Sequence, residues 1–408
     1  MTAEFRKYLP DLNSEKWINF QQQTALSHAT HLFDTIPLVR ELDVQWRKLY
    51  SKPFKGITID GNIVSDIYDA RDDGIDQKPI IAATKALLQQ LSPNQVEALM
   101  HTLSAPEWRA WSNPEIYMME LGLRLDEIAE PLSLSVLAII QATLSPEGYQ
   151  KAVSEMRINH FLGQLFQSPK VLNKYSYNFL IFGEPHETKP WGWLLYGHHL
   201  CMSVFLKGTQ IVISPTFTGA EPNEIDEGEF QGTKILFPEE ELGLRLMQRL
   251  TPSLQAKAQI YKDMHDPTMP DGRWNLADQR HLCGAFQDNR IVPYEGIPVS
   301  ELKAFWPHIL EIVEQFILYL PKRARTNRLK EVKEHLNETW FSWVGGYGYE
   351  DAFYYRIQSP VIIVEFDHHS GVFLDNEQPK RFHIHTIVRS PNGGDYGNAL
   401  RNGSERLV

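Results

Sequence analysis

The strongest constraint on the fold is a change in hydrophobic periodicity near residue 175. Before it, apolar residues recur at three-and-four spacing, which predicts helices over 14–36, 79–91, 92–103, 125–144 and 145–165. From Asn178 onward, short runs of aromatic and β-branched residues are separated by Gly, Pro and Asn, which predicts strands. Runs of helices and runs of strands without regular alternation indicate an α+β fold rather than a doubly wound sheet.

The remaining pattern completes this prediction. Strands are expected over 54–60, 179–182, 191–196, 200–206, 210–214, 352–358, 361–367 and 381–389. Further helices are expected over 238–250, 253–264, 276–286, 299–320 and 325–340, and a surface loop over 214–233. We predict a mostly helical part, 1–175, packed on a mixed or antiparallel β-rich part, 176–408, as two domains or as one compact domain.

Charge and the N-terminal sequence limit the partners. The chain has 40 Lys and Arg against 51 Asp and Glu, a net charge of −11, which repels nucleic acid and anionic lipid. A small-molecule substrate is therefore expected, with neither nucleic acid nor membrane as a partner. The N-terminus has no continuous apolar stretch of the signal-peptide type, so a cytoplasmic location is expected.

The two cysteines limit the metal chemistry that the chain can support. Cys201 and Cys283 have no CxxC spacing, and two cysteines are too few for a thiolate zinc site. One disulfide between them is an alternative, but in a reducing compartment we expect two buried free thiols.

The most informative local motif is the pair His383 and His385 in FHIHT. Alternate residues of a strand share a face, which puts these imidazoles about 7 Å apart along one side. Two imidazoles so placed can converge on one metal ion. An exposed strand with alternating polar residues gives the same pattern, so the motif needs support from elsewhere in the chain.

A neighbouring strand supplies that support. In VIIVEFD, Glu365 and Asp367 follow a continuous apolar run that is typical of a buried strand, and a buried carboxylate needs a compensating partner. If this strand and 381–389 form a hairpin, Glu365 can face His383 and His385. Glu365 then either completes a metal site or forms a hydrogen-bonded Glu–His pair.

A third nitrogen ligand is expected from the Gly197-His198-His199-Leu200 turn. Adjacent strand residues point to opposite faces, so one of His198 and His199 is expected to reach the site, and the sequence does not say which. The alternative is an aromatic-rich core strand with a histidine bonded to the backbone.

Other charged residues have less specific roles. Arg356 either clamps a substrate carboxylate or pairs with Glu365 or Asp367, and Asp395 is a candidate to orient a histidine. His368 and His369 are expected to be solvated in the hairpin loop. No GxGxxG motif after a strand, phosphate loop, GxSxG or HExxH motif occurs.

A series of motifs in fixed order between Phe54 and Leu400 resembles the domain-of-unknown-function 3500 family. They are Gly56–Gly61, Trp108–Asn113, Leu144–Tyr149, Pro190–Trp193, Gly197–Leu200, Pro215–Pro222, Tyr354–Ile357, Glu365–Asp367, His383–Thr386 and Asp395–Gly397. The resemblance implies no activity, but it makes the GHHL, ExD and HxHT elements family features. Val388 stands where the family usually has tryptophan.

These observations lead to one main hypothesis and two alternatives. In the main one, His383, His385, Glu365 and either His198 or His199 hold a divalent transition metal (Zn, Fe, Mn or Cu). Glu365 and Arg356 then assist a hydrolase or oxidoreductase reaction on a small molecule. The first alternative is a metal-free ligand-binding or structural protein with a hydrogen-bonded His/Glu core. The second is a metal-free acid–base enzyme that uses Glu365 and a histidine.

Overall fold

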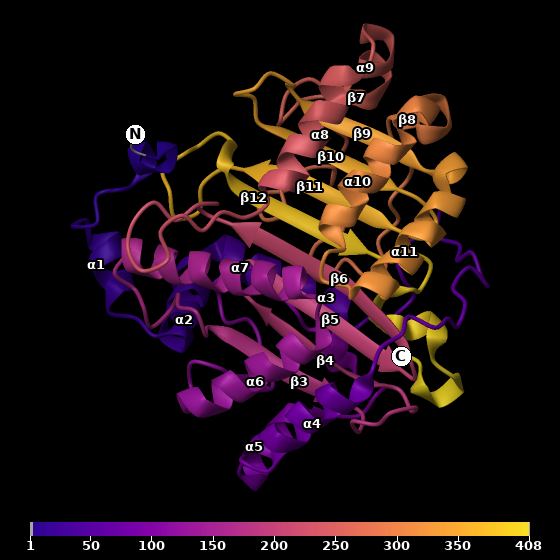
Figure 1. The fold of residues 1–408 in the computed structure, drawn as a ribbon. Coiled ribbons are helices and arrows are strands. Elements are labelled where there is room, and N and C mark those ends of the chain that lie inside the picture. Colours follow the sequence, from indigo (N-terminus) through magenta and orange to yellow (C-terminus); the bar gives the residue numbers. More distant parts are fainter. Residues whose placement is uncertain (1–2, 408) are drawn as a thin grey trace.

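The computed structural model describes residues 3–407 and has one large mixed sheet at its centre (Figure 1). Its twelve strands include a path in the order β1-β3-β4-β5-β6-β12-β11-β10-β9-β7, with β2 added beside β3 and β8 beside β9. The helices lie outside this sheet, so the α+β prediction is confirmed.

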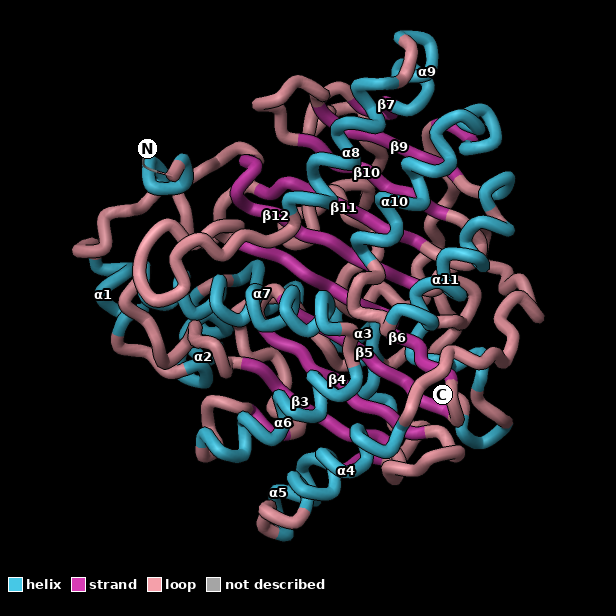
Figure 2. The backbone as a smooth tube through the Cα atoms, in the orientation of Figure 1, coloured by secondary structure: helices cyan, strands magenta, loops and turns pink. Residues whose placement is uncertain are grey.

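Two antiparallel meanders form most of the sheet, and they are joined where β6 pairs with β12 (Figure 2). The first meander contains β3 (Tyr177–Phe182), β4 (Trp191–Gly197), β5 (Leu200–Lys207) and β6 (Gln210–Ala220). The second contains β9 (Trp340–Gly345), β10 (Phe353–Gln358), β11 (Ile363–His369) and β12 (Lys380–Arg389). Short strands complete the sheet: β1 (Met100–His101), β2 (Leu123–Arg124), β7 (Gln259–Tyr261) and β8 (Ile297–Pro298).

One face of the sheet is covered by a layer of helices (Figure 1). These are α4 (Gln77–Leu88), α6 (Glu130–Thr143), α7 (Pro146–Leu165), α8 (Phe237–Arg249), α10 (Trp306–Phe316) and α11 (Lys322–Glu334). Smaller helices lie at the edges: α5 (Pro93–Leu99) and α9 (Pro252–Ala258). A single buried apolar cluster joins this layer to both meanders, from Val136 and Phe161 to Trp343 and Phe366.

The opposite face is covered by long connections and by the first helices of the chain. These helices are α2 (Ala25–Thr35) and α3 (Pro37–Tyr50), whereas α1 (Glu15–Gln21) buries Trp17 and Phe20 in the first cluster. A second apolar cluster on this face includes Trp46, Trp111, Phe217 and Phe286. Because both faces are buried, the strands carry the nearly continuous apolar runs seen in the sequence.

The predicted hairpin of 361–367 and 381–389 is confirmed. β11 and β12 pair antiparallel, with Asp367 opposite His385. His368 and His369 were expected in an exposed loop, and this expectation is wrong: both belong to β11 and both are buried.

The helix expected over 276–286 is absent from the structure, which has turns there. Its apolar spacing arises because Leu282, Cys283 and Phe286 enter the second apolar cluster. The backbone N–H groups of Leu282 and Cys283 donate to the Glu365 carboxylate instead of to helical carbonyls. The buried Glu365 carboxylate therefore accepts the hydrogen bonds that carbonyl groups would accept in a helix.

The prediction of a loop over 214–233 is also partly wrong, because β6 extends to Ala220 and pairs with both β5 and β12. Pro215 is tolerated there because it lies at a register shift between β5 and β6. The strand expected over 54–60 is reduced to one bridge, Thr58–Ile291. Helix α3 was not predicted, and the helix expected over 14–36 is divided into α1 and α2.

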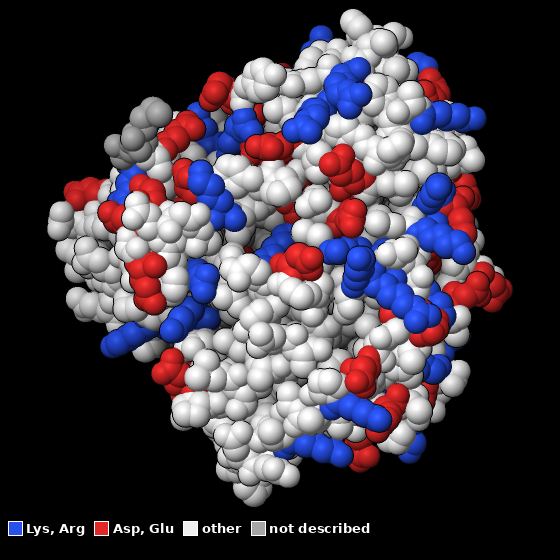
Figure 3. Space-filling model, viewed as in Figure 1, with Lys and Arg blue, Asp and Glu red and all other residues white. Residues whose placement is uncertain are grey.

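Within residues 3–407, no helix is both long and apolar enough to cross a bilayer. On the face drawn in Figure 3, Lys and Arg side chains are interspersed with Asp and Glu side chains. This face therefore has no extended single-sign patch of the kind that binds nucleic acid.

Candidate metal centre

The sheet and one turn bring three histidines together on the face that is covered by loops. His383 and His385 project from the same side of β12, and His385 lies opposite Gly219 of β6. His199 reaches them from the β4–β5 turn, where the Gly219 N–H donates to its carbonyl at 2.7 Å. Gly219 is required here because a Cβ on it would lie 2.9 Å from the His199 ring carbon Cδ2.

The imidazoles of these three residues converge through their Nε2 atoms. His385 Nε2 lies 3.2 Å from His383 Nε2 and 3.2 Å from His199 Nε2. One ligand atom from each residue lies within 4.8 Å of the others, and all three side chains are buried. Two nitrogens bound tetrahedrally to one zinc ion at about 2.05 Å are about 3.3 Å apart, so the spacing of His385 Nε2 from each of its two neighbours fits a shared metal ion.

Hydrogen bonds alone cannot account for both short contacts of His385 Nε2. His383 Nδ1 lies 2.8 Å from the Ser370 carbonyl, so Nδ1 carries the hydrogen of the neutral ring and Nε2 does not. His385 Nε2 then has two nitrogen neighbours but at most one hydrogen. At most one of the two 3.2 Å contacts is a proper hydrogen bond, whereas a metal ion uses all three lone pairs.

A second set of three histidines shares His385. Its other members, His281 and His369, are buried, and ligand atoms of the three residues lie within 4.8 Å of one another. His385 Nδ1 is 3.4 Å from His281 Nε2, so the two ring nitrogens of His385 face different neighbours. Sequence reasoning missed both residues, because His281 was placed in a helix and His369 in an exposed loop.

His198 does not join either set. Its Nδ1 lies 2.8 Å from Asn159 Oδ1, and its ring stacks on His199 with the centroids 3.8 Å apart. Of the two histidines that the sequence left open, His199 is the one that faces His385.

Glu365 is on the same face of the sheet, but its carboxylate is occupied. It accepts N–H groups from Leu282 at 2.9 Å and Cys283 at 2.9 Å, and the Tyr354 hydroxyl at 2.6 Å. Among residues 3–407, neither group of potential metal ligands includes it. Glu365 thus holds the 281–283 segment, and with it His281, against the sheet.

Arg356 and Asp395 also have partners other than those expected. Arg356 donates to Glu295 at 2.9 Å and to the Pro293 carbonyl at 3.0 Å. The partner of Asp367 is Arg280, with an Nε–Oδ1 distance of 2.6 Å. Asp395 accepts from Arg389 at 2.8 Å and from Ser214 at 2.6 Å, and it orients no histidine.

Burial keeps the clustered imidazoles in the form that binds metals. It lowers the pKa values of His199, His369 and His385 well below 6.5 and also lowers that of His383. Neighbouring imidazoles lower the first three further, because a charged ring beside another is unfavourable. These rings are therefore neutral at pH 7, and neutral imidazole is the metal ligand.

These shifts predict how acid affects the metal-free protein. Burial lowers the pKa of His198 to about 4, whereas an unfolded histidine titrates near 6.5. The unfolded state therefore binds more protons between these values, and the free energy of unfolding should fall by about 1.4 kcal/mol per pH unit for each such histidine. Above about pH 6.5 these groups should give no pH dependence.

Urea unfolding of chelator-treated protein at pH 7.5, 6.5, 5.5 and 4.5 measures this dependence. The His198→Gln variant should show a shallower slope, because it lacks one of the buried rings. Equal stability at pH 7.5 and 4.5 would contradict the expected linkage.

A cavity of about 750 Å³ leads to the histidines. His199, His369, His385 and Asp278 are among the residues that line it. Its lining also includes apolar side chains of the first three helices and of the α2–α3 connection: Trp17, Phe20, Leu32, Ile36, Leu38, Val39, Leu42 and Trp46. The cavity is large enough for an organic molecule, and neither Glu365 nor Arg356 lines it.

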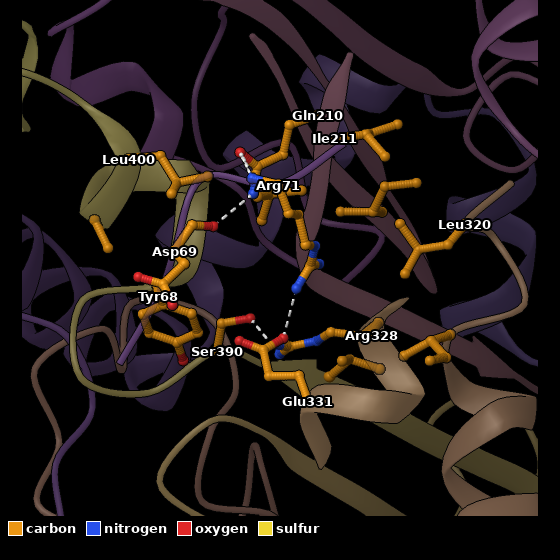
Figure 4. Close-up of a pocket in the computed structure, with 16 residues that line it drawn as sticks. Tyr68, Asp69, Arg71, Gln210, Ile211, Leu320, Arg328, Glu331, Ser390 and Leu400 are labelled. Carbon is orange, nitrogen blue, oxygen red and sulfur yellow. Dashed lines mark hydrogen bonds and ion pairs between the residues drawn. The ribbon is translucent and has the colours of Figure 1, made fainter. Parts of the chain in front are cut away.

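A second cavity, near α11, is far smaller at about 30 Å³ (Figure 4). Glu331 pairs there with Arg71 at 2.8 Å and with Arg328 at 2.7 Å. The cavity has room for about one or two waters, so we interpret it as a structural ion-pair cluster.

Comparison with known proteins yields a match to a protein family. The model of a family described as Protein of unknown function (DUF3500) matches residues 73–398. No curated protein and no solved structure matches the chain. The match includes all five clustered histidines but begins after α1–α3, which contribute residues to the lining of the large cavity.

Proposed function

Since the chain belongs to the DUF3500 family, whose description carries no activity, we propose its function from its own residues: a metal-dependent enzyme that acts on an apolar small molecule. His199, His383 and His385 would hold the divalent transition metal. The observation that carries this proposal is the 3.2 Å spacing of His385 Nε2 from each of the other two Nε2 atoms.

The ligand set limits the metal and the reaction class. Three neutral imidazoles suit zinc, copper and iron better than manganese, which prefers oxygen ligands. Three protein ligands leave a coordination position for water or substrate, as in catalytic rather than structural zinc sites. A metal so held supplies Lewis acidity and lowers the pKa of a water ligand, which supports hydrolysis; copper or iron would support oxidation.

The protein's own residues supply the surroundings that such a reaction needs. The His383 Nδ1–H group donates to the Ser370 carbonyl at 2.8 Å, which fixes the tautomer and orientation of that ring. His199 and His385 line the large cavity, which gives a small molecule a route to the metal. Apolar helix side chains that also line this cavity favour an apolar body on the substrate.

Metal analysis of protein purified without chelators tests the proposal. We expect at least one zinc, copper or iron per wild-type chain. The His199→Ala/His383→Ala variant should lose one equivalent, whereas His186→Ala/His335→Ala, which changes histidines outside both groups, should lose none. Wild-type protein that binds no transition metal, even after reconstitution, would overturn the proposal.

Gly219→Ala provides a variant that leaves every ligand in place. The new Cβ would lie 2.9 Å from His199 Cδ2 and 3.0 Å from the Ile384 carbonyl, so the His199 ring has to move. We expect metal affinity to fall roughly 10- to 100-fold with the far-ultraviolet circular dichroism unchanged. Unchanged affinity would contradict the role given to His199.

The apolar cavity is tested without knowledge of the substrate. The neutral fluorophore N-phenyl-1-naphthylamine should bind the metal-free protein with enhanced fluorescence, because its binding requires the cavity and not the metal. Leu32→Trp, which fills the cavity, should weaken binding about tenfold. Leu134→Trp, at a 52% exposed position on α6, should leave it unchanged. Equal binding by both variants would show that the fluorophore does not enter this cavity.

A further inference from the structure

We propose that the chain has a second cation position, held by His281, His369 and His385, and that the His385 ring is shared between the two positions. His385 directs its two nitrogens to different sets of histidines. Nε2 faces His199 and His383 at 3.2 Å each, and Nδ1 faces His281 Nε2 at 3.4 Å. This inference relies on the proposed function for the first position only.

The imidazoles around the second position have few other partners. His369 is only 2% exposed and its Nε2 has no hydrogen-bond partner among the described residues. This atom lies 3.0 Å from an Asp367 oxygen but without the alignment of a hydrogen bond. Buried polar nitrogens are normally bonded, so an unpaired one beside two further imidazoles is accounted for by a ligand.

Nearby carboxylates favour a positive charge at this position. Asp278 is buried, and its Oδ1 lies 3.8 Å from His281 Nε2. Asp367, by contrast, is already neutralised by Arg280 at 2.6 Å. A divalent cation beside His281 would therefore lie close to the buried Asp278 carboxylate and would be stabilised by its negative charge.

The cation class follows from the donors. Three imidazoles with a carboxylate nearby suit zinc or copper, and the cavity that reaches His369, His385 and Asp278 provides an entry path. When cations occupy both sides of the His385 ring, the ring gives up its remaining N–H proton to solvent and bridges them as imidazolate. Metal binding of this kind depends on pH, because it releases a proton.

Copper is the probe for the experiment. Metal-free wild-type protein is titrated with Cu(II) at pH 7.5, bound copper is counted per chain, and the electron paramagnetic resonance signal is integrated. We expect two copper ions per chain and a signal well below two spins, because copper ions joined by one imidazolate couple magnetically.

Paired variants separate this inference from the proposed function. His281→Ala/His369→Ala should bind one copper with a full one-spin signal, and His199→Ala/His383→Ala should likewise bind one. If the wild type binds only one copper, and only His199→Ala/His383→Ala loses it, the second position is overturned. The proposed function is then left intact. Two uncoupled copper ions would overturn the shared ring, and no copper in the wild type would overturn both proposals.

Discussion

Removal of bound metal with a chelator is expected to lower the melting temperature of the wild-type chain by about 5 °C for each position emptied. A ligand that binds only the folded state at a free concentration of about 1,000 times its Kd stabilises that state by about 4 kcal/mol. For a chain of 408 residues, that free energy corresponds to a shift of about 5 °C. The five clustered histidines come from the β4–β5 turn, the 262–296 connection, β11 and β12. Unfolding therefore separates them.

Differential scanning fluorimetry with and without a chelator gives this shift, and the added metal should restore the original melting temperature. The His199→Ala/His383→Ala variant should respond less, because one position is already lost. His186→Ala/His335→Ala should respond like the wild type. A wild-type protein with the same melting temperature in both conditions would argue for a metal-free hydrogen-bonded core.

Glu365→Gln is expected to destabilise the fold by about 3 kcal/mol. The carboxylate is fully buried and accepts three hydrogen bonds, from the N–H groups of Leu282 and Cys283 and from the Tyr354 hydroxyl. An amide turns its NH₂ group toward some of these donors and leaves them unpaired. Urea unfolding measures the loss, and Glu97→Gln at an exposed position should have no measurable effect.

The same variant distinguishes two roles for Glu365. If the residue positions the 281–283 segment, Glu365→Gln should weaken the second cation position, which contains His281, and spare the first. If Glu365 were instead a ligand beside His383 and His385, the first position would lose its metal. Copper titration of the variant separates these outcomes.

The sequence alone predicted the α+β class, most of the long helices and strands, and one strand pairing. Hydrophobic patterns of period 3.6 and period 2 depend only on which faces of a helix or strand are buried. They therefore predicted the helices of 77–165 and the hairpin of β11 and β12. The same alternation placed His383 and His385 on one side of β12. The turn containing His199 was also evident, because Gly197 and two adjacent histidines interrupt a strand pattern.

Only the tertiary structure decided which polar groups meet. The sequence could not choose between His198 and His199, since that depends on the left-handed backbone of His199, at φ +61°, and on the missing side chain of Gly219. It could not find His281, whose segment lacks regular structure because Glu365, 83 residues away along the chain from Leu282, takes its N–H groups. Local patterns record burial, whereas the assembly of a site depends on long-range contacts that no local period encodes.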